Sequence, residues 1–300
     1  MPLLCALVGA TGVGKTKLSL SLAKEFHAEI ISMDSRQIYK GFCIGTAQPS
    51  KEALQSIPHH LVDFYPPTEN FSVGEFVRNV KELLQKNPQT PYILVGGTGM
   101  YLQALTEGLA EIPQVSEDVR KHCEGILEKE GLETLVQKVK EVDPDSAQTI
   151  LPQDRQRLLR ALEVSIQTGR KFSEVRKDRR GGVGAVKTFW LDRDRETLYA
   201  NIDKRVLQMV DEGWKKEVES LLSRVPLAAP AWQSLGYKEW IACIQGKMSL
   251  HDVVETVQQG TRRYAKRQIT WFRHQTVAER IDLGESFAQN FASISQKLSK

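Results

Sequence analysis

The sequence predicts an α/β protein with a P-loop NTPase-like parallel sheet as its core and an all-helical insertion domain. Three observations support this prediction. Short apolar stretches alternate with helical patterns in the first third of the chain, a glycine-rich motif directly follows the first apolar stretch, and strand patterns then disappear between residues 116 and 176. With 300 residues, of which 41% are hydrophobic, the chain has enough apolar surface for a large core and a second domain.

The first third of the chain is built from alternating strand and helix patterns. Residues 3–8 and 29–33 are apolar and indicate buried strands, whereas residues 15–26 carry apolar side chains at helical spacing. The same patterns predict a short strand at 61–64, a helix at 73–84, a strand at 92–95 and a helix from Met100 onward. Because parallel neighbours require long crossover connections, this alternation indicates a parallel sheet covered by helices.

The middle of the chain has a different pattern. Ser116 followed by two acidic residues is typical of a helix start, and helical spacing continues to residue 176. The glycines within 181–184 predict a flexible joint before strand character returns at 186–191. We therefore expect a helical insertion domain at 114–185 inside a core formed by residues 1–113 and 186–300, with helices over 196–273 and a last strand at 280–283.

Composition narrows the class of protein. The formal net charge is only +4, but basic residues crowd into the stretches 155–187 and 262–273. Such local density is typical of a nucleic-acid surface, although a solvated protein surface gives the same pattern. No apolar run approaches the roughly 20 residues that cross a bilayer, and the N-terminus lacks the pattern of a signal peptide. We expect a cytoplasmic protein without a membrane partner.

The cysteines and histidines give no sign of a metal site. The four cysteines are scattered and form no C-x-x-C pair, which argues against zinc or a disulfide framework and fits a reducing compartment. His59 and His60 are adjacent, and adjacent strand residues point to opposite faces, so we expect a structural role for them. We expect the cysteines to be packing residues, and we expect four tryptophans to lie mostly in the core or at an interface: Trp190, Trp214, Trp232 and Trp240.

A phosphate-binding motif is the strongest local signal. It matches G-x-x-x-x-G-K-[ST] and consists of Gly9, Ala10, Thr11, Gly12, Val13, Gly14, Lys15 and Thr16. Backbone N–H groups of such a loop and of the following helix attract phosphate, the lysine adds a positive charge, and the threonine hydroxyl can bind Mg²⁺. A chance glycine turn is the alternative, but the flanking strand and helix argue against it. The motif indicates bound phosphate without specifying ATP.

The second strand ends at an acid, and the strand at 92–95 does not. In many P-loop ATPases and kinases a later strand ends in an acidic Mg²⁺ ligand, but here residues 96–99 are Gly-Gly-Thr-Gly. Asp34 is the comparable acid. It is interpreted as a metal-linked acid of a small-molecule kinase, as a base acting at the carboxyl edge of the sheet, or as a turn or cap residue. Spacing alone leaves all three interpretations open.

Longer motifs resemble the tRNA dimethylallyltransferase family, of the bacterial isopentenyl-tRNA transferase type. They are Asp-Ser-Arg-Gln-Ile-Tyr at 34–39, Ile-Gly-Thr-Ala at 44–47, Pro-His-His-Leu-Val-Asp at 58–63, Val-Gly-Gly-Thr-Gly-Met-Tyr-Leu at 95–102, Leu-Gly-Tyr-Lys-Glu at 235–239, Thr-Arg-Arg-Tyr-Ala-Lys-Arg-Gln at 261–268 and Thr-Trp-Phe at 270–272. They occur in the family's order and span nearly the whole chain. Met100 and Trp214 depart from the pattern, since the family often has leucine there.

The resemblance implies a reaction and roles for particular residues. The family transfers a dimethylallyl group from dimethylallyl diphosphate to the exocyclic N6 amine of adenine 37 in tRNA and releases diphosphate, with Mg²⁺ as cofactor. Asp34 would accept the amine proton, and Thr16 would help to bind Mg²⁺ and the diphosphate. Arg205, together with Lys15, would stabilise the departing diphosphate; the alternative for Arg205 is a solvated helix arginine.

The resemblance also implies a tRNA-binding set that would contact the anticodon stem-loop. Its members are Asp34, Ser35, Arg36, Gln37, Thr98, Arg120, Gln156, Arg157, Leu158, Leu159, Arg160, Gly236, Tyr237, Lys238, Lys266, Arg267, Gln268, Trp271 and Arg273. Cations beside aromatic side chains at 262–273 suit RNA, although a solvated helix with its aromatics in the core gives the same pattern. Nothing in the sequence demands an obligate protein partner, and a monomer is expected.

Three other functions share some of these features. An adenylate isopentenyltransferase would act on a free nucleotide, but it would not need the helical insertion or the basic stretch at 262–273. A small-molecule P-loop kinase would consume the γ-phosphate of ATP. A non-enzymatic RNA-binding protein with a nucleotide switch would bind RNA without forming a covalent product, and Asp34 would be dispensable for it.

Overall fold

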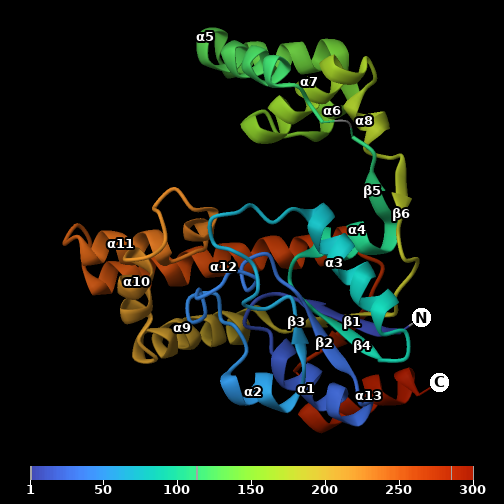
Figure 1. The fold of residues 1–300 in the computed structure, drawn as a ribbon, viewed down its shortest axis with the longest axis vertical. Coiled ribbons are helices and arrows are strands. Elements are labelled where there is room, and N and C mark those ends of the chain that lie inside the picture. Colours follow the sequence, from blue (N-terminus) through green and yellow to red (C-terminus); the bar gives the residue numbers. More distant parts are fainter. Residues whose placement is uncertain (1, 113, 285, 300) are drawn as a thin grey trace. The chain divides into compact units, whose positions relative to one another are not determined.

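The chain forms two compact units. The structure is a computed structural model that describes residues 2–112, 114–284 and 286–299 (Figure 1). The core unit consists of Met1–Ala104 and Ala185–Lys300, and the insertion unit consists of Leu105–Gly184. Residues 1, 113 and 300, where the predicted ranges begin or end, lie outside the described residues.

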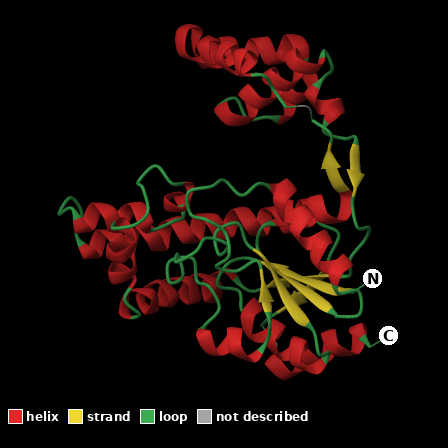
Figure 2. Ribbon diagram, in the orientation of Figure 1, coloured by secondary structure: helices red, strands yellow, loops and turns green. Residues whose placement is uncertain are grey.

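A parallel sheet forms the centre of the core unit (Figure 2). In the described part of the chain it is six-stranded, with the order β3-β2-β4-β1-β7-β8, and every neighbouring pair is parallel. The strands are β1 (Leu3–Gly9), β2 (Glu29–Met33), β3 (His59–His60), β4 (Tyr92–Gly96), β7 (Thr188–Asp192) and β8 (Glu279–Asp282). The predicted fold class, a parallel α/β sheet with helical additions, is confirmed.

Helices cover both faces of this sheet, with α1 and α13 on one face and α3 and α12 on the other (Figure 1). The helices of the core unit are α1 (Lys15–Glu25), α2 (Lys51–Ser56), α3 (Val73–Lys86), α9 (Arg195–Asp211), α10 (Trp214–Leu222), α11 (Tyr237–Ile244), α12 (Leu250–Gln275) and α13 (Phe287–Leu298). A further helix, α4 (Gly99–Glu107), continues into the insertion unit. The predicted helices at 15–26 and 73–84 and the strands at 3–8, 29–33 and 92–95 are confirmed.

One predicted strand is wrong. The apolar residues at 61–64 do not form a strand, and the strand that pairs with β2 is β3, two residues earlier. Leu61 and Asp63 have φ angles of 60° and 52°, in the left-handed region. A strand requires extended backbone, so these two residues end it.

Two clusters of side chains hold the core unit together. Around the sheet, Leu7, Ile93 and Phe189 pack against leucines of α1, and all three are fully buried. A second, aromatic cluster joins α9–α12 to the chain at 38–42, with Phe42 in contact with Trp232 and Tyr237. Trp190, Trp214, Trp232 and Trp240 are all buried, which confirms the core positions expected for them.

The insertion unit is helical between residues 116 and 176 in the part that the structure describes, as predicted. Its helices are α5 (Glu117–Val142), α6 (Pro144–Thr149), α7 (Arg155–Thr168) and α8 (Phe172–Val175). The Ser116 side chain accepts a hydrogen bond from the N–H of Val119, which confirms the predicted helix start. None of the described helices of either unit is long and apolar enough to span a bilayer.

The flexible joint predicted at 181–184 is partly a strand instead. Gly181 ends β6 (Arg179–Gly181), which pairs in antiparallel fashion with β5 (Gly108–Ala110). In the paired ribbon, backbone N–H and C=O groups form hydrogen bonds with the neighbouring strand, whereas those of a free glycine linker would bond to water. The chain therefore enters and leaves the insertion unit through one two-stranded ribbon.

Candidate active site

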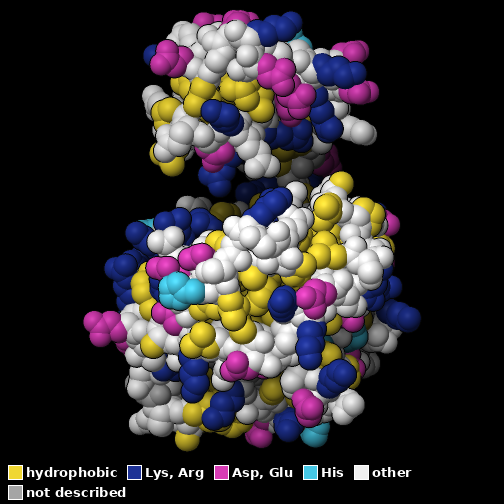
Figure 3. Space-filling view, turned by 90° about the vertical axis from the view of Figure 1, so that its left-hand side faces the viewer, with side chains coloured by type: hydrophobic (Ala, Val, Ile, Leu, Met, Phe, Trp, Pro, Cys, Tyr) yellow, Lys and Arg dark blue, Asp and Glu magenta, His cyan; other side chains and the backbone are white. Residues whose placement is uncertain are grey.

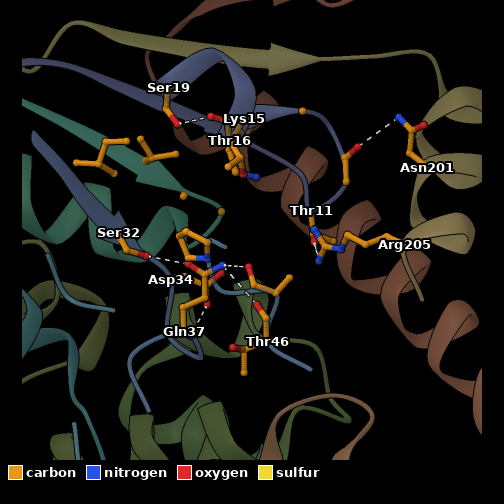
Figure 4. A pocket seen from close by; sticks show the side chains of 18 of the residues that line it. Thr11, Lys15, Thr16, Ser19, Ser32, Asp34, Gln37, Thr46, Asn201 and Arg205 are labelled. Atoms are coloured by element: carbon orange, nitrogen blue, oxygen red, sulfur yellow. Dashed lines mark hydrogen bonds between the residues drawn. The ribbon is translucent and has the colours of Figure 1, made fainter. Parts of the chain in front are cut away.

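A cavity of about 410 Å³ lies in the core unit where β1, β2 and β4 end. In parallel α/β sheets this carboxyl edge is where ligands bind. Figure 4 shows the glycine-rich loop on one side of the cavity and Asp34 on another, with side chains of α9 closing it. Its lining includes Thr11, Lys15, Thr16, Asp34, Gln37, Asn201, Lys204, Arg205, Gln208 and Gln268.

The glycine-rich loop presents a helix end to this cavity. Gly14 precedes α1 with a φ of 113°, and no side chain caps the helix. The first N–H groups of a helix have no partner inside the helix, so these groups remain available for an anion. The Lys15 ammonium donates to the carbonyl oxygens of Gly9 and Ala10, at 2.8 Å each, and so lies against its own loop.

The surroundings of Lys15 disfavour its charged form. Burial, and then the neighbouring Arg205 guanidinium, lower the pKa of Lys15 to about 7, while the Asp34 carboxylate acts in the opposite direction. Burial also lowers the pKa of Arg205, which the charge of Asp34 opposes. An anion bound at the loop would favour the charged forms of Lys15 and Arg205, because it would add negative charge beside them.

Asp34 has one free carboxylate oxygen. Its Oδ1 accepts hydrogen bonds from the backbone N–H groups of Arg36 at 2.8 Å and Gln37 at 3.3 Å. Its Oδ2 has no hydrogen bond to any residue that the structure describes. The turn therefore fixes the carboxylate while leaving an acceptor open toward the cavity.

Two side chains tie the loop to other elements of the site. Arg205 of α9 donates to the Thr11 hydroxyl at 2.9 Å. The amide of Gln268, on α12, accepts from the Thr11 N–H at 2.9 Å and donates to the Gly97 carbonyl at 3.0 Å. Gln268 thus joins the ends of β1 and β4, and it is only 5% exposed. Gln268 also lines the large cavity, so its predicted contact with tRNA stays a prediction and would involve only a nucleotide that enters the cavity.

A smaller cavity of about 90 Å³ adjoins the large one, and both are lined by Thr11, Asp34, Thr46 and Arg205. Its remaining wall combines apolar residues with the polar side chains of Arg36, Ser234, Thr261 and Tyr264. The apolar residues are Val206, Met209, Trp214, Leu235 and Val257. The larger cavity beside the loop has both polar and apolar walls, the latter including Ile30 and Val95, and the smaller cavity continues on the other side of the residues that they share.

The chain between Asp34 and Gln48 is anchored by a residue that sequence reasoning missed. The Glu217 carboxylate of α10 accepts hydrogen bonds from the N–H groups of Cys43 at 2.9 Å, Ile44 at 2.7 Å and Gly45 at 3.3 Å. It also accepts from the Tyr237 hydroxyl at 2.8 Å. The available signal was its spacing: Glu217 follows Trp214 by three residues and so shares the buried face of α10.

Loss of the Glu217 charge should loosen this segment. We expect Glu217→Gln to speed amide hydrogen exchange at Cys43, Ile44 and Gly45 at least about tenfold, because charge-assisted hydrogen bonds contribute roughly 1.5–3 kcal/mol each. Exchange measured by NMR or mass spectrometry checks this. Glu219→Gln is the matched control, since Glu219 is an exposed acid of the same helix. Equal exchange at 43–45 in both variants would contradict the anchoring role.

The predicted tRNA-binding residues of the core unit fall into three groups. Asp34, Ser35, Arg36 and Gln37 follow β2, and Thr98 follows β4. The exposed ones are Lys238 on α11 and Lys266, Arg267 and Arg273 on α12. Gly236, Tyr237 and Gln268 are buried, and Trp271 is partly buried. The amide of Gln37 donates to the Ala47 carbonyl at 2.8 Å, so it supports the same segment that Glu217 anchors.

In the insertion unit, Arg120 lies on α5 and residues 156–160 lie on α7. Arg120, Gln156 and Arg157 are exposed, whereas Leu158 is fully buried and Arg160 lies 3.5 Å from the Glu163 carboxylate. On the face drawn in Figure 3, basic side chains of this unit lie next to acidic ones. An anionic partner would therefore meet selected cations, not a uniformly positive face.

Comparison with known proteins identifies relatives along nearly the whole chain. The tRNA dimethylallyltransferase of Bacillus licheniformis is 40% identical over 279 residues, covering 91% of this chain and 88% of that protein. The enzyme of the same description from Phenylobacterium zucineum is 41% identical over 277 residues, covering 91% and 90%.

Solved structures are similar as well. The tRNA isopentenylpyrophosphate transferase of Bacillus halodurans has a TM-score of 0.71 and 34% identity, covering 98% of this chain and 94% of that one. A eukaryotic dimethylallyltransferase crystallised acting on tRNA has a TM-score of 0.83 and 27% identity, covering 98% and 77%. The sequence model described as IPP transferase matches residues 37–275. The chain therefore belongs to the IPP transferase family.

Proposed function

We infer that this protein is a prenyltransferase that attaches a dimethylallyl group to an adenine of tRNA. Relatives about 40% identical over nine tenths of the chain carry that activity in their description. The observation in the site that carries the inference is the placement of one open carboxylate, Asp34, beside both an anion-binding loop and cavities with apolar walls. The loop suits the phosphate of a donor, and the apolar walls suit the donor's apolar group. The carboxylate suits a nucleophile that must lose a proton.

We further propose dimethylallyl diphosphate as the donor, held by its diphosphate on the loop. N–H groups at the start of α1 would bind its oxygens, and Lys15 and Arg205 would balance its charge. As the carbon–oxygen bond to the allylic group breaks, the electron pair passes to the diphosphate. The two cations would stabilise that growing charge more than they stabilise the bound donor, which is what accelerates the step.

Mg²⁺ fits this arrangement through one protein ligand. The Thr16 hydroxyl lines the cavity, and its oxygen makes no hydrogen bond to any described residue. Across residues 2–112, 114–284 and 286–299, no group of three His, Cys, Asp or Glu side chains could hold a metal. We therefore propose that Thr16 and diphosphate oxygens would coordinate the ion, which would neutralise diphosphate charge.

Asp34 would act on the acceptor. The exocyclic N6 amine of adenine, which we propose lies at tRNA position 37, is a weak nucleophile because its lone pair is delocalised into the ring. As this nitrogen bonds to the allylic carbon it must lose a proton, and Asp34 Oδ2 is the open acceptor. This assignment favours the base interpretation of Asp34 over a metal-linked acid and over a turn residue alone.

We propose that exposed cations of both units contact the anticodon stem-loop, with the protein acting as a monomer in the cytoplasm. Lys266→Ala combined with Arg267→Ala should lower the slope of log affinity against log salt by about 2, because each phosphate contact releases about one counterion. Filter binding of tRNA over a salt series measures the slope. Lys215→Ala combined with Lys216→Ala, which removes two exposed cations of α10, is the control. An unchanged slope would place α12 away from RNA.

Label transfer tests the function directly. The protein is incubated with Mg²⁺, radiolabelled dimethylallyl diphosphate and unmodified tRNA with adenine at position 37, and a second reaction contains AMP in place of tRNA. Label on tRNA alone is expected. Label on AMP would identify an adenylate isopentenyltransferase. Label on neither would reject prenyl transfer and leave the kinase and nucleotide-switch functions.

A further inference from the structure

One side of helix α9 forms a polar wall of the larger cavity. Its residues there are Asn201, Lys204, Arg205 and Gln208. Each of them lies three or four residues from two of the others, so all four share one side of the helix. The Asn201 amide donates to the Gly12 carbonyl at 3.4 Å, and Arg205 donates to the Thr11 hydroxyl, so this side of α9 lies against the glycine-rich loop (Figure 4).

Lys204 is a cation of this wall that no acid of the protein balances. It is exposed, and it makes no ion pair or hydrogen bond with any residue in the described part of the chain. The adjacent acid, Asp203, pairs instead with Arg262 of α12. None of the residues three or four positions away on the helix is acidic: they are Ala200, Asn201, Leu207 and Gln208.

The larger cavity has more positive than negative side chains. Among the described residues that line it, the lysines and arginines are Lys15, Lys204 and Arg205, and the single carboxylate is that of Asp34. A cleft with such an excess attracts a multiply charged anion. The donor proposed above is such an anion, and its terminal phosphate, like that of a phosphate monoester, carries about 1.5–2 negative charges at pH 7.

The two cations of α9 face different parts of the site. Arg205 lines both cavities, as Asp34 does, whereas Lys204 lines only the larger one. Successive residues of a helix point about 100° apart, so Lys204 and Arg205 reach different oxygens. The donor carbon that is attacked must lie beside Asp34, so the phosphate bonded to that carbon lies on the side of Arg205. The terminal phosphate then lies on the side of Lys204.

We propose that Lys204 binds the terminal phosphate of the donor and so selects diphosphates over monophosphates. The proposal rests on the donor inferred above and adds a specificity-determining residue to it. When the carbon–oxygen bond breaks, the electron pair passes to the phosphate that was bonded to carbon, and the terminal phosphate changes little. Lys204 therefore stabilises the bound donor and the transition state alike, which lowers KM and leaves kcat unchanged.

Calorimetry without tRNA tests this contact directly. Dimethylallyl diphosphate and dimethylallyl monophosphate are each titrated, with Mg²⁺ present, into wild type and into Lys204→Gln. We expect the Kd of the diphosphate to rise about 5- to 30-fold, between the effects of an exposed ion pair and of a charge-assisted hydrogen bond. The Kd of the monophosphate should stay within about twofold, since it lacks the terminal group. In transfer to tRNA, the KM for the donor should rise by the same factor as its Kd, with kcat within about threefold of wild type.

Two variants serve as controls. Lys204→Arg keeps the charge and should bind the diphosphate with nearly wild-type affinity. Lys216→Gln removes an exposed cation of α10 that lines neither cavity, and it should equal wild type for both ligands.

Three results would overturn the role of Lys204. The diphosphate could bind Lys204→Gln as tightly as wild type. Both ligands could lose affinity equally, which would mean that the lysine only adds to the general potential of the cavity. The KM for tRNA alone could rise, which would place Lys204 against RNA. Absence of transfer by the wild type would instead overturn the proposed function, and the calorimetry would still decide what Lys204 binds.

Discussion

Asp34→Asn should lower kcat for transfer to tRNA by about 10²–10⁴-fold, the usual contribution of a positioned general base. Asparagine retains an oxygen that accepts from the N–H groups of Arg36 and Gln37, so the turn should persist. What it loses is the ability to take the amine proton. Single-turnover label transfer at saturating donor measures the chemical step, and tRNA affinity should stay within about tenfold, because this side chain supplies no phosphate contact.

The control for this variant is Asp63→Asn. Asp63 also accepts a backbone hydrogen bond, from the N–H of Gly41 at 2.7 Å, but it lines neither cavity. Its rate should equal that of wild type. If Asp34→Asn turned over at a rate within about threefold of wild type, a proton acceptor would have to be sought elsewhere, and Asp34 would be a turn residue.

Removal of the Lys15 charge should have the second largest effect. We expect Lys15→Ala to lower kcat/KM for the donor by about 10²–10³-fold at pH 6.5, the size found when one preorganised group stabilising a developing negative charge is deleted. In wild type the same charge should disappear with rising pH, because the pKa of Lys15 is lowered to about 7 in the free protein.

The sign of the pH effect follows from which protonation form of Lys15 binds the donor. Bound diphosphate favours charged Lys15, so above pH 7 the donor must bind together with a proton, and kcat/KM should fall toward tenfold per pH unit. Steady-state rates from pH 6 to 9 at subsaturating donor check this. Lys15→Ala should lack the fall, and Lys24→Ala, an exposed lysine in the last turn of the same helix, should retain it. A flat wild-type profile would mean that Lys15 stays charged throughout.

Local patterns predicted most of the core unit. The apolar stretches at 3–8 and 29–33 became β1 and β2 because a buried parallel strand needs only a short apolar run. The glycine-rich motif and Asp34 could be placed at one sheet edge for the same reason, since both directly follow strands. The strand at 61–64 failed because apolar composition does not reveal a left-handed backbone at Leu61 and Asp63.

The contacts that complete the site could not be predicted from local patterns. Glu217 and Cys43 are 174 residues apart, and Gln268 lies 257 residues from Thr11. In the sequence, Gln268 is a polar residue within a basic stretch, which favours a surface role. Only the packing of α12 against β1 brings it to the loops after β1 and β4, which its amide joins. Such long-range hydrogen bonds depend on the tertiary structure, and propensity and periodicity carry no information about them.

The ribbon formed by β5 and β6 has a consequence for how this protein could have evolved. Gly108 pairs with Gly181, so the chain's departure from the core unit and its return lie side by side although the two glycines are 73 positions apart in the sequence. Domains with neighbouring ends are readily inserted into a host or removed from it. Two recombination events at this ribbon would exchange the whole helical module without interrupting the sheet. Descendants would thus acquire a new helical module while retaining the sheet and the site at its carboxyl edge.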